Sequence, residues 1–117
     1  MSLDPKIAAL IGFAAKSGKL LLGTYSVEQG ISQRKAKLVL AAENVNPKRL
    51  EILNLWCSDM GIAFLAAGLK EEYGKLLQKP PLGLLALTDE HMASGILAEV
   101  KKQEEIRLSL QETTGGD

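Results

Sequence analysis

Glycine and lysine residues between positions 12 and 19 give this stretch the composition of a phosphate-binding loop. Five residues separate Gly12 from Gly18, whereas the nucleotide-binding motif has four, and Leu20 stands where that motif carries a magnesium-binding Ser or Thr. The motif also follows a strand, whereas here a helix is predicted before the glycines. The pattern therefore argues against nucleotide hydrolysis at this segment.

Asp89, Glu90 and His91 bring two carboxylates together with the only histidine of the chain. A metal centre needs three or four converging ligands, and there is no second cysteine to complete such a set. The acidic residues lie at a predicted helix start, where the helix dipole favours negative charge. Cys57 has no histidine near it in the sequence, so a buried inert thiol is expected. We expect no metal, no cofactor and no enzymatic activity.

Length and composition predict one globular domain with its own core. The chain has 117 residues, 46% of them hydrophobic, and a single cysteine that excludes an internal disulfide. No apolar stretch approaches the ~18 residues of a membrane span, and the N-terminus lacks the charged-then-apolar order of a signal peptide. A cytoplasmic protein without a membrane partner is the expectation.

The formal net charge is zero, but the charge is unevenly distributed along the chain. Residues 1–50 contain eight basic and three acidic residues, so this half carries +5 and the remainder carries −5. Such asymmetry within one domain indicates an anion-facing surface built by the N-terminal half. A chance difference between solvated faces is the alternative interpretation.

Caps, glycines and apolar spacing predict strands that alternate with helices. In the first half we expect a helix from Asp4-Pro5 to about Lys16, a strand over 19–22, a helix capped by Thr24 to about Arg34, and a buried central strand over 36–42. In the second half we expect a helix from Asn46-Pro47 to Gly61, a strand over 62–67, a helix over 69–77, a loop over 78–81, a strand over 82–87, and a helix capped by Thr88 or Asp89. This order predicts an α/β fold, a small three-layer α/β/α sandwich with a mixed four-stranded central sheet.

The C-terminal residues change in composition after Val100. The expected organisation is a domain over residues 4–100, followed over 101–117 by a helix extension and a flexible tail. Ile106, Leu108 and Leu110 alternate with polar residues, which suits an edge strand or a docking segment, although a helix is an equal alternative. Residues 113–117 are predicted to be disordered.

Several motifs in order along the chain resemble one known family. Residues 23–29 lie where its pattern reads G-x-N-E-x-x-K, residues 36–39 where it reads A-K-L-V, and residues 42–47 where it reads A-E-D-x-x-P. Residues 15–19, 73–75 and 87–89 are similar to the K-x-G-K, L-G-R/K and V-T-D segments of its bacterial YlxQ-type members. From about residue 5 to residue 100, the chain resembles the kink-turn-binding ribosomal-protein family.

The resemblance implies a non-catalytic protein that binds structured RNA, in which a glycine opens a helix toward tandem G·A pairs and a loop before the last strand packs on a flipped nucleotide. The positions it implies for RNA contact are Gly23, Thr24, Tyr25, Ser26 and Gln29, with Lys19 and Glu43 alongside and Lys79, Pro80 and Pro81 in the loop. A helix N-terminus behind a glycine is also an anion site by geometry, and we expect Lys16, Lys19, Lys35 and Lys37 to flank it.

Three positions differ from the family pattern. Tyr25 stands in place of Asn, Ser26 in place of Glu, and Gln29 in place of Lys, so two charged contacts to RNA are absent. Tyr25 can stack on a base instead. We expect weak, strongly salt-dependent binding of structured RNA, with ribosomal RNA as one candidate.

The alternative is a member of the same fold that has lost kink-turn recognition and binds a protein partner or a second copy of itself. That interpretation uses Tyr25, Leu21 and Leu22, or the apolar residues of the tail at 106, 108 and 110.

Overall fold

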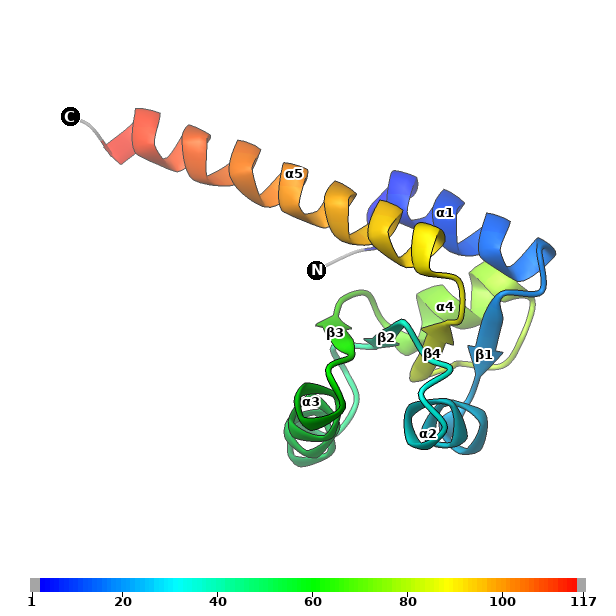
Figure 1. The fold of residues 1–117 in the computed structure, drawn as a ribbon. Helices are drawn as coiled ribbons and strands as arrows, with labels where there is room; N and C mark the ends of the chain where they lie inside the picture. Colours follow the sequence, from blue (N-terminus) through cyan, green and yellow to red (C-terminus); the bar gives the residue numbers. More distant parts are fainter. Residues whose placement is uncertain (1–2, 116–117) are drawn as a thin grey trace.

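The computed structural model describes residues 3–115, with side chains through residue 105. Within these residues, five helices alternate with four strands, as predicted (Figure 1). The elements are α1 Pro5–Lys16, β1 Leu20–Leu22, α2 Thr24–Ser32, β2 Leu38–Ala41, α3 Pro47–Met60, β3 Ala63–Ala66, α4 Lys70–Leu77, β4 Leu84–Leu87 and α5 Glu90–Gly115.

The four strands form one mixed sheet in the order β1-β4-β2-β3. Strand β4 is antiparallel to both of its neighbours, and β2 pairs with β3 in parallel. Strands β1, β2 and β3 therefore run in one direction and β4 in the other. The predictions of a mixed four-stranded sheet and of a central strand near residues 38–41 are confirmed.

Helices cover both faces of the sheet, which makes the three predicted layers. Figure 1 shows α1, α4 and α5 on one side and α2 and α3 on the other. Strands β2 and β4 are fully buried. Because successive side chains of a strand point to opposite faces, each of these strands contributes to two cores, one on either side of the sheet. Leu38, Leu40, Leu85 and Leu87 pack with α1, α4 and α5, whereas Val39, Ala41, Leu84 and Ala86 pack with α2 and α3.

Local capping residues set most helix boundaries where the sequence predicts them. Asp4 Oδ1 accepts hydrogen bonds from the amides of α1, Asn46 Oδ1 accepts one from the amide of Lys48, and Gly61 ends α3 with a left-handed φ of 69°. Asp89 caps α5 by accepting from the amide of Met92 at 2.9 Å.

The prediction that Thr24 caps α2 is wrong. Gly23 occupies the cap position, and Thr24 is the first helical residue. The glycine makes the sharp exit from β1 with φ 88° and ψ 166°, and its carbonyl already accepts the amide of Val27.

Helix α5 is longer than the sequence indicates. It continues to Gly115, so residues 106–110 are helical and residues 113–115 are not disordered, whereas residues 116–117 lie outside the described part. Between Gly95 and Gly115 the sequence has neither glycine nor proline and is rich in Lys, Gln, Glu and Leu, which favour helix. None of the described helices combines the length and apolar character that crossing a membrane requires.

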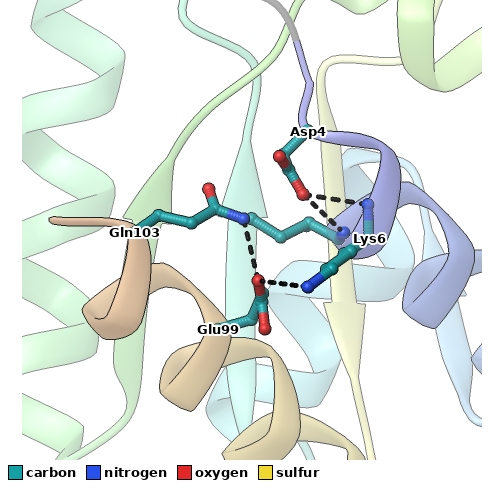
Figure 2. A network of polar contacts seen from close by, with 5 residues as sticks. Asp4, Lys6, Glu99 and Gln103 are labelled. Carbon is teal, nitrogen blue, oxygen red and sulfur yellow. Dashed lines mark hydrogen bonds and ion pairs between the residues drawn. The ribbon is translucent and has the colours of Figure 1, made fainter. Parts of the chain in front are cut away.

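A polar network joins the start of α1 to the middle of α5 (Figure 2). Lys6 Nζ lies 4.0 Å from Glu99 Oε1, and the Gln103 amide donates to the same oxygen at 3.1 Å. The Gln103 side chain is the main cause that lowers the pKa of Asp4 below its ordinary value, followed by the backbone amides that Asp4 caps. The network lies between α1 and α5, and Asp4 and Gln103 also line a cavity with Ala66 and Ala67 at the carboxyl end of β3.

Candidate nucleic-acid interface

One end of the sheet gathers the starts of three helices. Because β1, β2 and β3 run in the same direction, α2, α3 and α4 all begin at their carboxyl ends. The amide of Gly23 donates to the carbonyl of Leu84 and that of Ala42 to Gly83, both at 2.9 Å, which fixes these starts around the entry to β4. Helix N-termini carry partial positive charge, and the carboxyl ends of strands are the usual position of a ligand in an open α/β sheet.

The start of α2 differs from those of α3 and α4 in having open backbone donors. Asn46 caps α3, and Asn44 Oδ1 accepts from the amide of Lys70 at 3.0 Å at the start of α4. No side chain in the described residues caps α2, so the amides of residues 24–26 have no partner within the helix. The conformation of Gly23 is essentially restricted to glycine. These amides are available to an anion or to a base edge.

A cleft of about 430 Å³ lies next to these open amides. Arg49 and Lys70 are its basic residues, and no acidic residue is among the described side chains that line it. Arg49 Nη2 contacts Glu28 Oε2 at 3.0 Å, a half-exposed ion pair that joins α3 to α2. The lining residues are Gly23, Thr24, Val45, Asn46, Arg49, Leu53, Lys70, Pro81, Leu82, Gly83 and Leu84.

The loop before β4 forms one wall of this cleft and is held by close backbone contacts. The amide of Lys79 donates to the carbonyl of Gly74 at 2.8 Å, and that of Leu82 donates to Lys70 at 3.0 Å. A Cβ atom at Gly74 would lie 2.7 Å from the carbonyl oxygen of Pro80, so only glycine allows the loop to pack this closely. Pro81 lines the cleft, whereas Lys79 and Pro80 are exposed on the loop and are not among its lining residues.

The residues predicted along α2 differ in how close they lie to this cleft. Gly23 and Thr24 line it, and Tyr25 is 76% exposed at the start of the helix. Ser26 is half-buried in the same turn, while Gln29 lies farther along and accepts a hydrogen bond from Gln33 at 3.1 Å.

Glu43 is at the same end of the sheet, directly after β2. Its amide donates to the carbonyl of Gly68 at 2.8 Å, which ties the segment after β2 to the start of α4. Its contact with RNA, like that of the residues along α2, stays a prediction.

The four predicted flanking lysines lie at the opposite end of the sheet. The carbonyl of Lys19 accepts from Thr88 at 3.0 Å, and the amide of Lys37 donates to Leu87 at 2.7 Å, so both adjoin the carboxyl end of β4. The backbone between Lys19 and Gly23 spans roughly 13 Å of extended chain. Lys16 ends α1 and Lys35 lies in the turn before β2. The prediction that these lysines flank the start of α2 is wrong, because β1 and β2 run from the lysines toward the cleft.

The apolar residues of β1, an edge strand, are half-buried. Leu21 packs with the core under α2 and α3, and Leu22 packs with the core under α1, α4 and α5. Their use against a partner protein stays a prediction, and the side chains at 106, 108 and 110 lie outside the described part.

The other candidate groups have structural environments. Cys57 is buried as expected, and burial raises its pKa to about 11. Tyr73 is fully buried, burial raises its pKa, and its hydroxyl donates to the carbonyl of Ala67. Asp89 caps α5, and the described residues contain no group of three or more His, Cys, Asp or Glu that could hold a metal ion.

Sequence reasoning missed Asn46, Arg49 and Lys70 as residues of the cleft. A signal for the first two was present, because the Asn46-Pro47 start follows a buried strand and places Arg49 in the first turn of α3. Lys70 has no such signal, since its place depends on the pairing of β3 with β2.

The sequence profile of the ribosomal protein L7Ae/L30e/S12e/Gadd45 family matches residues 5–108. The chain belongs to this family. Its relatives within the L7Ae/L30e/S12e/Gadd45 family include the large ribosomal subunit protein eL8 of Cenarchaeum symbiosum, 28% identical over 86% of this chain and 82% of that protein. The eL8 protein of Nitrosopumilus maritimus is 33% identical over 61% of this chain and 56% of its own length.

Solved structures share the fold. A protein of unknown function from Bacillus halodurans superposes with a TM-score of 0.75 at 20% identity, over 81% of this chain and 96% of that one. The Giardia lamblia 15.5kD RNA-binding protein superposes with a TM-score of 0.69 at 19% identity, over 90% and 92% of the two chains.

Proposed function

We propose that this protein binds structured RNA, without catalysis, at the cleft between the starts of α2 and α3. The observation that carries the proposal is the start of α2, where Gly23 leaves backbone amides open beside a cleft whose charged lining is Arg49 and Lys70. Membership in the L7Ae/L30e/S12e/Gadd45 family supports it. Two relatives are named as large ribosomal subunit proteins and one structural neighbour as an RNA-binding protein, which supports an RNA ligand and a cytoplasmic ribosome as its place.

Each group in the cleft suits a different part of a bent RNA. The amides of residues 24–26 can donate to base edges or phosphates, and the guanidinium of Arg49 can make paired hydrogen bonds to a phosphate. Tyr25, largely exposed at the same helix start, can stack on an unpaired base. Residues 4–100 would carry this function, with 101–117 as an extension of α5.

Direct titration with RNA tests the proposal. A labelled hairpin that contains a kink-turn with tandem G·A pairs is compared at low salt with the same hairpin carrying Watson–Crick pairs there. We expect the kinked hairpin to bind more tightly, and the double variant Arg49→Gln/Lys70→Gln to lose at least about tenfold in affinity, since a hydrogen bond to a charged group contributes about 1.5–3 kcal/mol.

The matched control is Lys101→Gln/Lys102→Gln, which removes two exposed lysines from α5. It should bind the hairpin within about twofold of the wild type, because neither lysine lines the cleft and exposed charges outside it are screened. Equal affinity of both double variants for the kinked hairpin would contradict the proposal.

A further inference from the structure

We infer that the lysine end of the sheet is a second RNA-binding surface, which holds the phosphate backbone of another RNA segment while the cleft holds the first. The lysine end is defined here as Lys16, Lys19, Arg34, Lys35 and Lys37, around the carboxyl end of β4. The inference rests on the proposed function for the RNA in the cleft, and the experiment below separates the two claims.

The lysines at this end are unneutralised. Lys16, Lys19, Lys35 and Lys37 are all exposed, and in the described residues none of their side chains makes an ion pair or a hydrogen bond. Arg49 at the cleft end, in contrast, is already paired with Glu28. Four free ammonium groups can each release a counterion from a phosphate backbone, which favours binding without base recognition.

Backbone contacts hold these lysines in fixed places relative to one another. Lys19 and Lys37 directly precede β1 and β2, the strands that flank β4. Their backbones are hydrogen-bonded to Thr88 and Leu87, so two strand spacings, about 10 Å in total, separate them. The amide of Lys35 donates to the carbonyl of Gly30 at 2.8 Å. Arg34 has a left-handed φ of 59°, and its Nη1 donates to the carbonyl of Met60 at 3.2 Å.

A cleft of about 430 Å³ opens at this end between α5 and the start of β2 and β3. Arg34 and Lys37 line it, and Glu90 is the acidic residue among its described lining. Asp89 and Glu90 follow β4 at this end, and the five basic residues outnumber them. Lysine is depleted in the cores of protein interfaces, so a surface built from lysines suits a phosphate backbone better than a protein partner.

Two labelled RNAs distinguish one binding surface from two. The full chain is first saturated with the unlabelled kinked hairpin, and the anisotropy of a labelled, unbent RNA duplex is then followed over a range of salt concentrations. We expect the duplex to bind the hairpin-loaded protein within about threefold of its affinity for the free protein.

Paired variants assign the duplex to the lysine end. Lys19→Gln/Lys37→Gln should weaken duplex binding at least about tenfold and reduce the slope of log affinity against log salt by about 2, since each phosphate contact contributes about 0.9. It should leave hairpin affinity within about twofold, as should Lys101→Gln/Lys102→Gln for both RNAs. A thermal melt confirms that each variant is folded.

The outcomes separate this inference from the proposed function. Displacement of the duplex by the hairpin, or duplex affinity unchanged in Lys19→Gln/Lys37→Gln, would overturn the second surface and leave the cleft proposal intact. Lysine-dependent duplex binding without any hairpin binding would overturn the cleft proposal and support the second surface.

Discussion

The two ends of the sheet differ in how many basic residues they carry and in how they present them. At the cleft end, Arg49 and Lys70 lie in a shaped space beside open helix amides, and Arg49 is held by Glu28. At the lysine end, Lys19 and Lys37 extend from turns into solvent with no carboxylate partner in the described residues. One end is suited to recognising the shape of an RNA and the other to binding its charge.

This difference shows why net charge is a poor guide to function in this chain. Directional donors and a cleft give selectivity with few charges, whereas free lysines give affinity that falls steeply with salt. A protein of zero net charge can contain both a selective cleft and a surface of free lysines when the basic residues of its N-terminal half are concentrated at two places.

Exchanging the two charges of the Arg49–Glu28 ion pair should cause the greatest loss of hairpin affinity at the cleft. In the double variant Glu28→Arg/Arg49→Glu the pair is retained in reverse, so we expect stability to stay within about 1 kcal/mol of the wild type. Hairpin affinity should fall by more than about tenfold, because a carboxylate then faces the RNA in the cleft. Titration with the hairpin and the duplex measures both ends, and wild-type hairpin affinity in the exchanged protein would show that the charge of Arg49 does not matter.

Substituting Gly23 should cause a smaller loss of hairpin affinity, and this loss should also be confined to the cleft end. Gly23→Ala forces a side chain into a conformation with φ 88°, which costs of order 1–3 kcal/mol of unfolding free energy and disturbs the open amides of α2.

Gly12→Ala is the matched control, since a Cβ atom meets no neighbouring atom at either position, but Gly12 is helical. Urea unfolding should show Gly12→Ala as stable as the wild type or more stable by up to about 1 kcal/mol. Equal stability of the two variants would exclude backbone strain as the reason for glycine at position 23.

Removing the charge of Asp4 should have the smallest effect and leave both ends unchanged. The folded state lowers the pKa of Asp4 from 3.8, so its ionised form stabilises the fold above that pH and the contribution is lost as the pH falls through the lowered value. Asp4→Asn should flatten the acid limb of a plot of melting temperature against pH. An unchanged acid limb would mean that Gln103 and the capped amides do not favour the ionised form.

Much of the fold could be predicted from the sequence because its signals are local. Asp4-Pro5 and Asn46-Pro47 start helices, Gly61 ends one, and the run over residues 38–41 is apolar enough to be covered on both faces. The length of α5 could not be predicted with the same certainty, because alternating apolar residues at 106, 108 and 110 fit a strand as well as a helix.

The site was predictable only in part. Gly23 could be identified from a sequence motif. The motif has a physical reason, because the backbone there has a φ of 88°, which glycine readily adopts. Lys70 and the loop that contacts Gly74 come to the cleft through packing between elements far apart in the sequence, which no local pattern describes.

Local sequence patterns account for the helices and strands, the glycine that opens α2 and the basic character of the N-terminal half. The places where the basic residues gather depend on strand pairing, because β4 lies between β1 and β2 and is antiparallel to both, so that β1 and β2 run in the same direction. Lys19 and Lys37, which precede those strands, therefore share one end of the sheet, while Gly23 and Arg49, which follow them, share the other. Strand order depends on hydrogen bonds between distant segments, and these form only when the whole chain folds.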